Sequence, residues 1–170
     1  MKQEKCFENY PLRIVFISNL VSIAIYLIGA FIIYKIGFIW LILYLLFIGA
    51  LEFRLISGHC VNCYYYGKTC AFGKGRLCAL LFRKGNPKKF LNIKITWKDI
   101  LPDFMVSIIP ALVGIIILIS NFDWTLLILI IILLFLTFAG SGFVRGSLAC
   151  KCCKQRKLGC PALKLFKKKN

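Results

Sequence analysis

Residues 14–34 read IVFISNLVSIAIYLIGAFIIY, a run of 21 residues without a charged side chain. At a rise of about 1.5 Å per residue, a helix of this length spans about 30 Å, the thickness of a bilayer core. The turn residues Lys35, Ile36 and Gly37 follow, and then a second apolar run, 38–53, interrupted only by Glu52. A turn this short predicts an antiparallel helical hairpin, which returns the chain to its starting side.

The second half of the chain repeats this pattern. A short apolar run, 105–120, contains Pro110, and an uncharged run of 21 residues, 124–144, follows the turn at 121–123. The sequence therefore predicts an all-α membrane protein, one integral domain with four transmembrane helices in two hairpins. Residues 90–101 fit either a strand or an amphipathic helix, and we favour a helix in the membrane interface because Trp97 and Lys98 are typical of that depth.

Composition excludes an ordinary soluble protein. Hydrophobic residues make up 60% of the chain, yet its net charge is +17. Of the 23 basic residues, 22 lie in the N-terminus, the 54–101 segment and the C-terminal tail, and only Lys35 lies at an outer turn. This asymmetry predicts a cell-membrane protein with both termini in the cytoplasm. The charge then indicates anionic lipid headgroups as partners rather than nucleic acid.

The long segment and the tail carry matching cysteine triplets with the spacing C-x2-C-x6-C. The first comprises Cys60, Cys63 and Cys70, and the second comprises Cys150, Cys153 and Cys160. Cytoplasmic thiols stay reduced, so disulfides are not expected. Clustered thiols at fixed spacing indicate metal ligands instead.

The triplets belong to a longer internal repeat. Pro11 and Arg54 flank the first hairpin at a separation of 43 residues, and Pro102 and Arg145 flank the second at the same separation of 43. Phe47, Gly49 and Ala50 match Phe138, Gly140 and Ser141 at one constant offset. We interpret the chain as two parallel repeats, about 11–78 and 102–166, joined by an interfacial linker, 79–101. Gly49 and Gly140 are expected to let the second helix of each repeat approach its twin.

Three thiolates do not complete a tetrahedral zinc site. Each triplet could recruit a further ligand, and the candidates are Cys78 or His59 for the first and Cys6 or Cys152 for the second. Alternatively, the two triplets share one centre. Used twice, this spacing is similar to that of the fungal binuclear zinc-cluster domains, and the resemblance implies six thiolates holding two zinc ions. Here the 79 residues from 71 to 149 separate the triplets, and DNA binding does not carry over.

A third alternative is an iron–sulfur cluster on three cysteines. We therefore expect a non-enzymatic binding or scaffold protein with structural zinc, and keep two alternatives. One is a membrane redox protein that passes electrons to a cytoplasmic partner. The other is a metal-dependent enzyme acting on a lipid or membrane-tethered substrate, for which Glu52 and His59 would be the reactive groups. The chain has no phosphate-binding loop, nucleophile elbow or dinucleotide fingerprint.

Overall fold

Four long apolar helices form the body of the protein. The computed structural model describes residues 6–92 and 97–160. The first hairpin consists of α1 (Leu12–Tyr34) and α2 (Phe38–Gly58). The second begins with α5 (Trp97–Ser120) and returns through consecutive helical segments: α6 (Trp124–Phe135), η2 (Leu136–Gly140), α7 (Ser141–Phe143) and η3 (Val144–Ala149). All four helices are long and apolar enough to cross a membrane, so the chain is a multi-pass membrane protein.

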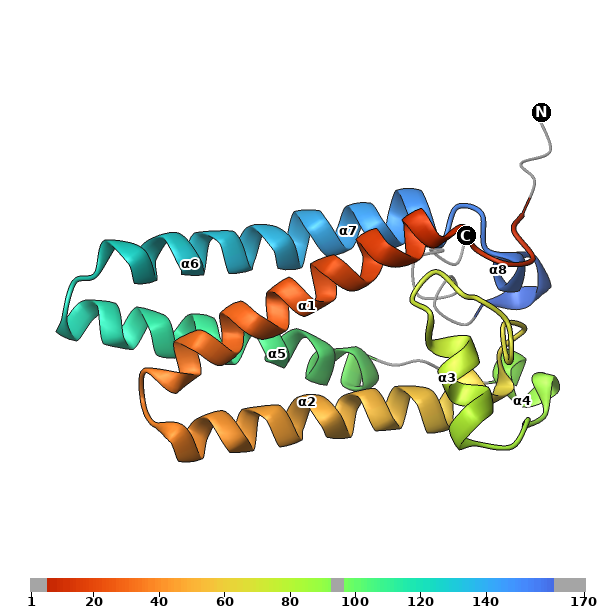
Figure 1. The fold of residues 1–170 in the computed structure, drawn as a ribbon, viewed down its shortest axis with the longest axis horizontal. Coiled ribbons are helices and arrows are strands. Elements are labelled where there is room, and N and C mark those ends of the chain that lie inside the picture. Colours follow the sequence, from red (N-terminus) through yellow and green to blue (C-terminus); the bar gives the residue numbers. More distant parts are fainter. Residues whose placement is uncertain (1–5, 93–96, 161–170) are drawn as a thin grey trace.

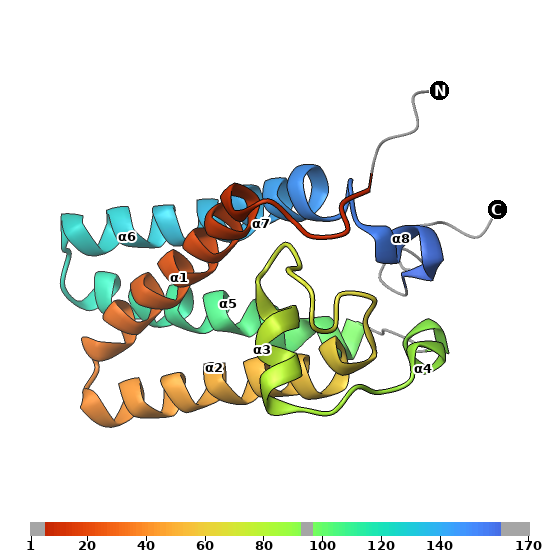
Figure 2. The same ribbon diagram turned by 45° about the vertical axis from the view of Figure 1, so that its right-hand side comes forward.

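The short elements gather at one end of the bundle. They are η1 (Cys60–Asn62), α3 (Lys74–Leu81), α4 (Pro87–Asn92) and α8 (Lys154–Gly159). The two hairpin turns lie at the opposite end (Figure 1), and the turned view in Figure 2 shows the same separation. We call the end that carries the short elements the cysteine end. No named strand occurs in the described ranges; a single isolated bridge pairs Phe7 with Cys153.

Both predicted turns are confirmed, because each is marked by local chemistry. Gly37 separates α1 from α2 at φ 153°, a backbone conformation that favours glycine. Asp123 precedes α6 as an N-cap, and its Oδ1 accepts a hydrogen bond from Thr125 N at 2.8 Å. Lys35 and Asp123 then form an ion pair between the turns at 3.9 Å. Both side chains are exposed, so this pair contributes little.

The helix ends at the cysteine end differ from the predicted ones. Helix α2 continues to Gly58, five residues beyond the predicted end at Phe53, and the fourth spanning helix continues to Ala149 rather than Val144. Helix α5 begins at Trp97, so residues 97–101 extend the third span instead of forming a separate interfacial helix with 90–96. The remaining part of that prediction is α4 through Asn92, and residues 93–96 lie outside the described ranges. Charged residues near an interface do not stop a helix whose next turns are apolar.

The centre of the bundle is formed by the first helix of each hairpin. Ile25 and Ile32 of α1 pack with Ala111 of α5 and with three leucine or isoleucine residues of α6, which are Leu126, Ile130 and Leu133. Outward-facing side chains are equally apolar, for example Ile119 at 81% and Ile39 at 73% exposure. Lipid chains solvate such a surface, so helix association depends on close packing and internal hydrogen bonds rather than on burial from water.

A proline supplies one of these internal hydrogen bonds. Pro110 lies inside α5 and lacks an N–H, so the carbonyl four residues earlier, at Val106, has no intrahelical donor. The Tyr44 hydroxyl of α2 donates to that Val106 oxygen at 2.8 Å. Tyr44 is only 5% exposed, and its hydrogen bond joins α2 to α5. The proline thus creates the acceptor that links the two hairpins inside the membrane.

Close helix approach occurs at glycines other than the predicted pair. No atom lies within 4 Å of a Cβ built on Gly49, and a Cβ on Gly140 would meet Val21 of α1 rather than the twin helix α2. The tight positions are Gly29, where a Cβ would lie 2.2 Å from Tyr44 Oη, and Gly114, where it would lie 2.8 Å from Ile130 Cδ1. The prediction for Gly49 and Gly140 was therefore wrong, because the rotation of each helix about its axis is set by tertiary packing.

Gly29→Ala is expected to destabilise the bundle by about 1–3 kcal/mol, as overpacking does. The new methyl would displace Tyr44 and strain its hydrogen bond to Val106. Thermal unfolding in detergent measures the effect, with Gly49→Ala as the matched control in open space. Gly49→Ala should be neutral or slightly stabilising. Equal stability of the two variants would contradict the packing described.

Candidate thiol centre at the cysteine end

The two C-x2-C turns have the same backbone hydrogen bonds. Cys63 N donates to Cys60 O at 3.2 Å, and Cys153 N donates to Cys150 O at 3.4 Å. Three residues further on, Tyr66 N donates to Cys63 O and Arg156 N donates to Cys153 O, both at 3.1 Å. The second cysteine of each turn is extended, with φ −81° and −79°. Equal sequence spacing therefore produces equal local geometry, as the repeat predicts.

The fold brings the two triplets together. Cys63 interacts electrostatically with Cys70 of its own triplet and with Cys153 and Cys160 of the other. Cys60 interacts in the same way with Cys63 and Cys70, and Cys150 with Cys153 and Cys160. The six thiols therefore form one connected group, although the triplets follow different hairpins. We call this group the thiol cluster.

Gln155 joins the two cysteine segments directly. This residue of α8 is only 6% exposed. Its Oε1 accepts a hydrogen bond from Tyr64 N at 2.8 Å and lies 3.9 Å from Cys63 Sγ. A single side chain of the second segment thus fixes the backbone of the first beside Cys63. Sequence reasoning missed this residue, since an isolated glutamine carries no signal of a distant partner.

Residues 6–10 run between the same two segments and bind both, and we call them the strap. Phe7 N donates to Cys152 O at 3.2 Å, and Tyr10 N donates to Thr69 O at 2.9 Å. The Tyr10 hydroxyl donates to Ala149 O at the end of η3. That carbonyl belongs to a helix terminus and lacks an intrahelical donor. The strap therefore fastens the end of the second hairpin to the first cysteine segment.

The tyrosine run 64–66 serves the lobe interior instead of an interfacial aromatic belt. Tyr65 is 3% exposed. Its hydroxyl donates to Phe7 O at 2.7 Å and accepts from Lys154 N at 3.0 Å. Tyr66 donates to Phe82 O at 2.7 Å. The interfacial interpretation of this run was wrong, because these hydroxyls bond to backbone atoms of distant segments rather than to headgroups.

The other candidate ligands lie around the cluster. Cys78 of α3 is fully buried, donates to Ile56 O at 3.7 Å, and interacts electrostatically with Cys60 and Cys70. His59 ends α2 next to Cys60 and is half-buried. Cys6 and Cys152 lie on the strap side, where they interact with Tyr65 and Tyr10 respectively. Cys78 is therefore well placed to complete the first triplet.

The donor chemistry suits a soft or borderline metal ion, since thiolates bind zinc and iron–sulfur clusters. Within residues 6–92 and 97–160, however, no three Cys, His, Asp or Glu side chains are arranged so that they could hold a metal ion. Loss of solvent is the main factor that raises the pKa of Cys63 to about 11, and it also raises the pKa of Cys153. Buried neighbouring thiols without a counter-charge favour the protonated form.

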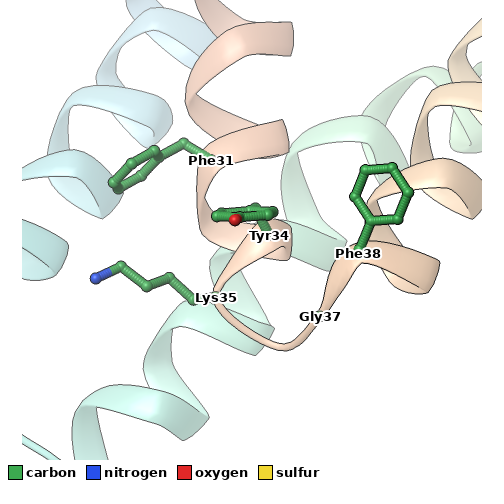
Figure 3. Close-up of a pocket in the computed structure, with 5 residues that line it drawn as sticks. All are labelled: Phe31, Tyr34, Lys35, Gly37 and Phe38. Atoms are coloured by element: carbon green, nitrogen blue, oxygen red, sulfur yellow. The ribbon is translucent and has the colours of Figure 1, made fainter.

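An open depression lies at the far end of the molecule, at the turn between α1 and α2 (Figure 3). Its lining consists of Phe31, Tyr34, Lys35, Gly37 and Phe38. Phe31 and Lys35 contact each other, with Nζ 5.7 Å from the ring centroid. Its lining contains neither a nucleophile nor a carboxylate, so the thiol cluster remains the candidate site.

Comparison with known proteins adds no relative: no protein-family profile, curated protein or solved structure matches this chain.

Proposed function

We propose that the protein is a non-enzymatic membrane protein whose cysteine end holds zinc between its two hairpins. The observation that carries this proposal is the interaction of Cys63 with Cys153 and Cys160 across the two triplets. Each triplet alone lacks a fourth ligand. Ligands from both triplets, with Cys78 beside the first, complete a sulfur-rich coordination shell.

Zinc in this position acts as a clamp. The strap and Gln155 already hold the two cysteine segments next to each other. We expect the cysteine side chains to turn toward the ion, which attracts thiolates and opposes the effect of burial on their protonation. The apolar spans have little preference for one another over lipid, so a metal link outside the membrane would stabilise the pairing of the hairpins.

The cysteine end faces the cytoplasm in this proposal, and the protein lies in the cell membrane. The support is the charge asymmetry, with 22 of 23 basic residues on that side of the predicted spans. Reduced thiols are available for a metal in that compartment.

Elemental analysis and a visible spectrum of anaerobically purified full-length protein test the proposal. We expect roughly one to two zinc ions per chain and no visible absorption, because zinc has a filled d shell. The double variant Cys63→Ser/Cys153→Ser should lose the metal. Iron with acid-labile sulfide and absorption near about 400 nm would replace the proposal with the redox alternative. A metal-free chain would contradict both.

A further inference from the structure

A second polar group lies where the helices leave the membrane at the cysteine end. Glu52 of α2 accepts hydrogen bonds from Tyr26 of α1 at 2.8 Å and from Lys74 of α3 at 2.5 Å. The Glu52 and Lys74 side chains are 28% and 22% exposed. This ion pair therefore ties the first residue of α3 to the spanning helices, and the charges of its two members cancel.

Three more charges converge beside this pair. Asp103 of α5 interacts electrostatically with Arg145 of η3 and Arg54 of α2, and also with Lys74 and Glu52. We call Glu52, Arg54, Lys74, Asp103 and Arg145 the boundary cluster. Its members come from both hairpins and from α3, which lies against the end of α2 in Figures 1 and 2. The cluster is separate from the six thiols of the proposed zinc site.

The boundary cluster is open to lipid. Arg54, Asp103 and Arg145 are exposed, whereas Glu52 and Lys74 are half-buried. Large apolar side chains next to the exposed charges are exposed too: Phe53 at 62%, Leu101 at 54% and Phe143 at 60%. Exposed apolar side chains beside exposed charges mark the depth at which acyl chains meet headgroups. A ligand that reaches these charges from the bilayer carries both a polar head and an apolar tail.

The charge balance selects the head. Three cations, Arg54, Lys74 and Arg145, face two carboxylates, Glu52 and Asp103, which leaves one positive charge. A phosphodiester carries one negative charge and so neutralises the cluster. Arginine suits this role because its planar guanidinium donates two parallel hydrogen bonds to phosphate oxygens.

We propose that Arg54 and Arg145 together bind the phosphodiester of a single membrane phospholipid at the boundary cluster. Asp103, between them, orients both guanidinium groups. The two arginines occupy equivalent positions, each 43 residues after the proline that precedes its hairpin. One arginine therefore comes from each repeat, and the bound lipid joins the two hairpins at the membrane surface. This inference does not depend on zinc in the thiol cluster.

Native mass spectrometry of the detergent-purified full chain with added phosphatidylglycerol tests the site. We expect one lipid per chain to remain bound after the detergent is removed. Arg145→Gln and Arg54→Gln should each weaken this binding about tenfold or more, the loss expected when a charge-assisted hydrogen-bond pair is removed. Arg145→Lys keeps the charge and should weaken it less. Circular dichroism and zinc content establish that each variant is folded.

The matched control is Arg83→Gln, which removes an exposed arginine beyond α3. It should leave lipid retention unchanged. If Arg83→Gln lowers retention as much as Arg145→Gln, binding reflects general attraction to basic side chains and the proposal fails. Retention that is unchanged in both boundary variants also overturns it. Displacement of the lipid by equimolar inorganic phosphate would show that the site takes the free anion, and would overturn the assignment to a lipid.

Discussion

Tyr10→Ala is expected to detach the strap and to destabilise the cysteine end by about 3–5 kcal/mol, as removal of a large buried aromatic side chain does. Tyr10 is 4% exposed and packs with Tyr65, Ala71 and Ala149. The ring lies outside the spans, so its removal exposes apolar surface to water rather than to lipid. The substitution also removes the hydrogen bond to the terminal carbonyl of η3.

Hydrogen exchange measures this loss at two backbone amides. Phe7 N and Tyr10 N both donate to segments that the strap joins, so both should exchange faster in the variant. Tyr10→Phe keeps the ring and should cost only about 1 kcal/mol. Tyr34→Ala, at a position 55% exposed near the opposite end, is the matched control and should leave both amides protected. Unchanged protection in Tyr10→Ala would show that the strap is held in another way.

Single substitutions in either triplet are expected to remove most of the bound zinc. In a shared centre, Cys63→Ser and Cys153→Ser each take a ligand from the same coordination shell, so each variant should retain less than half of the wild-type zinc. A thiolate contributes strongly because the neutral serine hydroxyl that replaces it is a poor zinc ligand. Elemental analysis of the three proteins, purified side by side, gives the comparison.

The control for these variants is Cys152→Ser, which removes a thiol adjacent to Cys153 but outside both triplets. It should retain its zinc, and a loss would identify Cys152 as the further ligand instead of Cys78. Two independent sites would give a different pattern. Each single variant would then keep the zinc of the intact triplet, and only the double variant would be empty.

Local chemistry explains what could be predicted from the sequence. The spans follow from uncharged apolar runs, and the turns at 35–37 and 121–123 follow from the glycine and the capping aspartate that end and begin helices. The common position of the triplets follows from an even number of spans between them. Each of these features depends on neighbouring residues or on counting, so no tertiary contact had to be known.

Contacts between distant segments could not be predicted. Gln155, Tyr65 and the strap act through hydrogen bonds to backbone atoms 58 to 146 residues away, and the backbone carries no sequence signal. Gly29 and Gly114 were missed for another reason. A helix that is apolar on all sides gives no moment that tells the packed face from the lipid face, so glycine alone did not reveal which positions approach another helix.

X-ray absorption at the zinc edge, on anaerobically purified full-length protein, tests the central claim most directly. A centre shared by the two triplets predicts zinc with a shell of four sulfur atoms at about 2.3 Å, the distance of a zinc–thiolate bond. It further predicts that Cys153→Ser disrupts this shell although the first triplet is intact. A shell of oxygen and nitrogen atoms, or a four-sulfur shell that survives Cys153→Ser unchanged, would contradict the shared thiol centre.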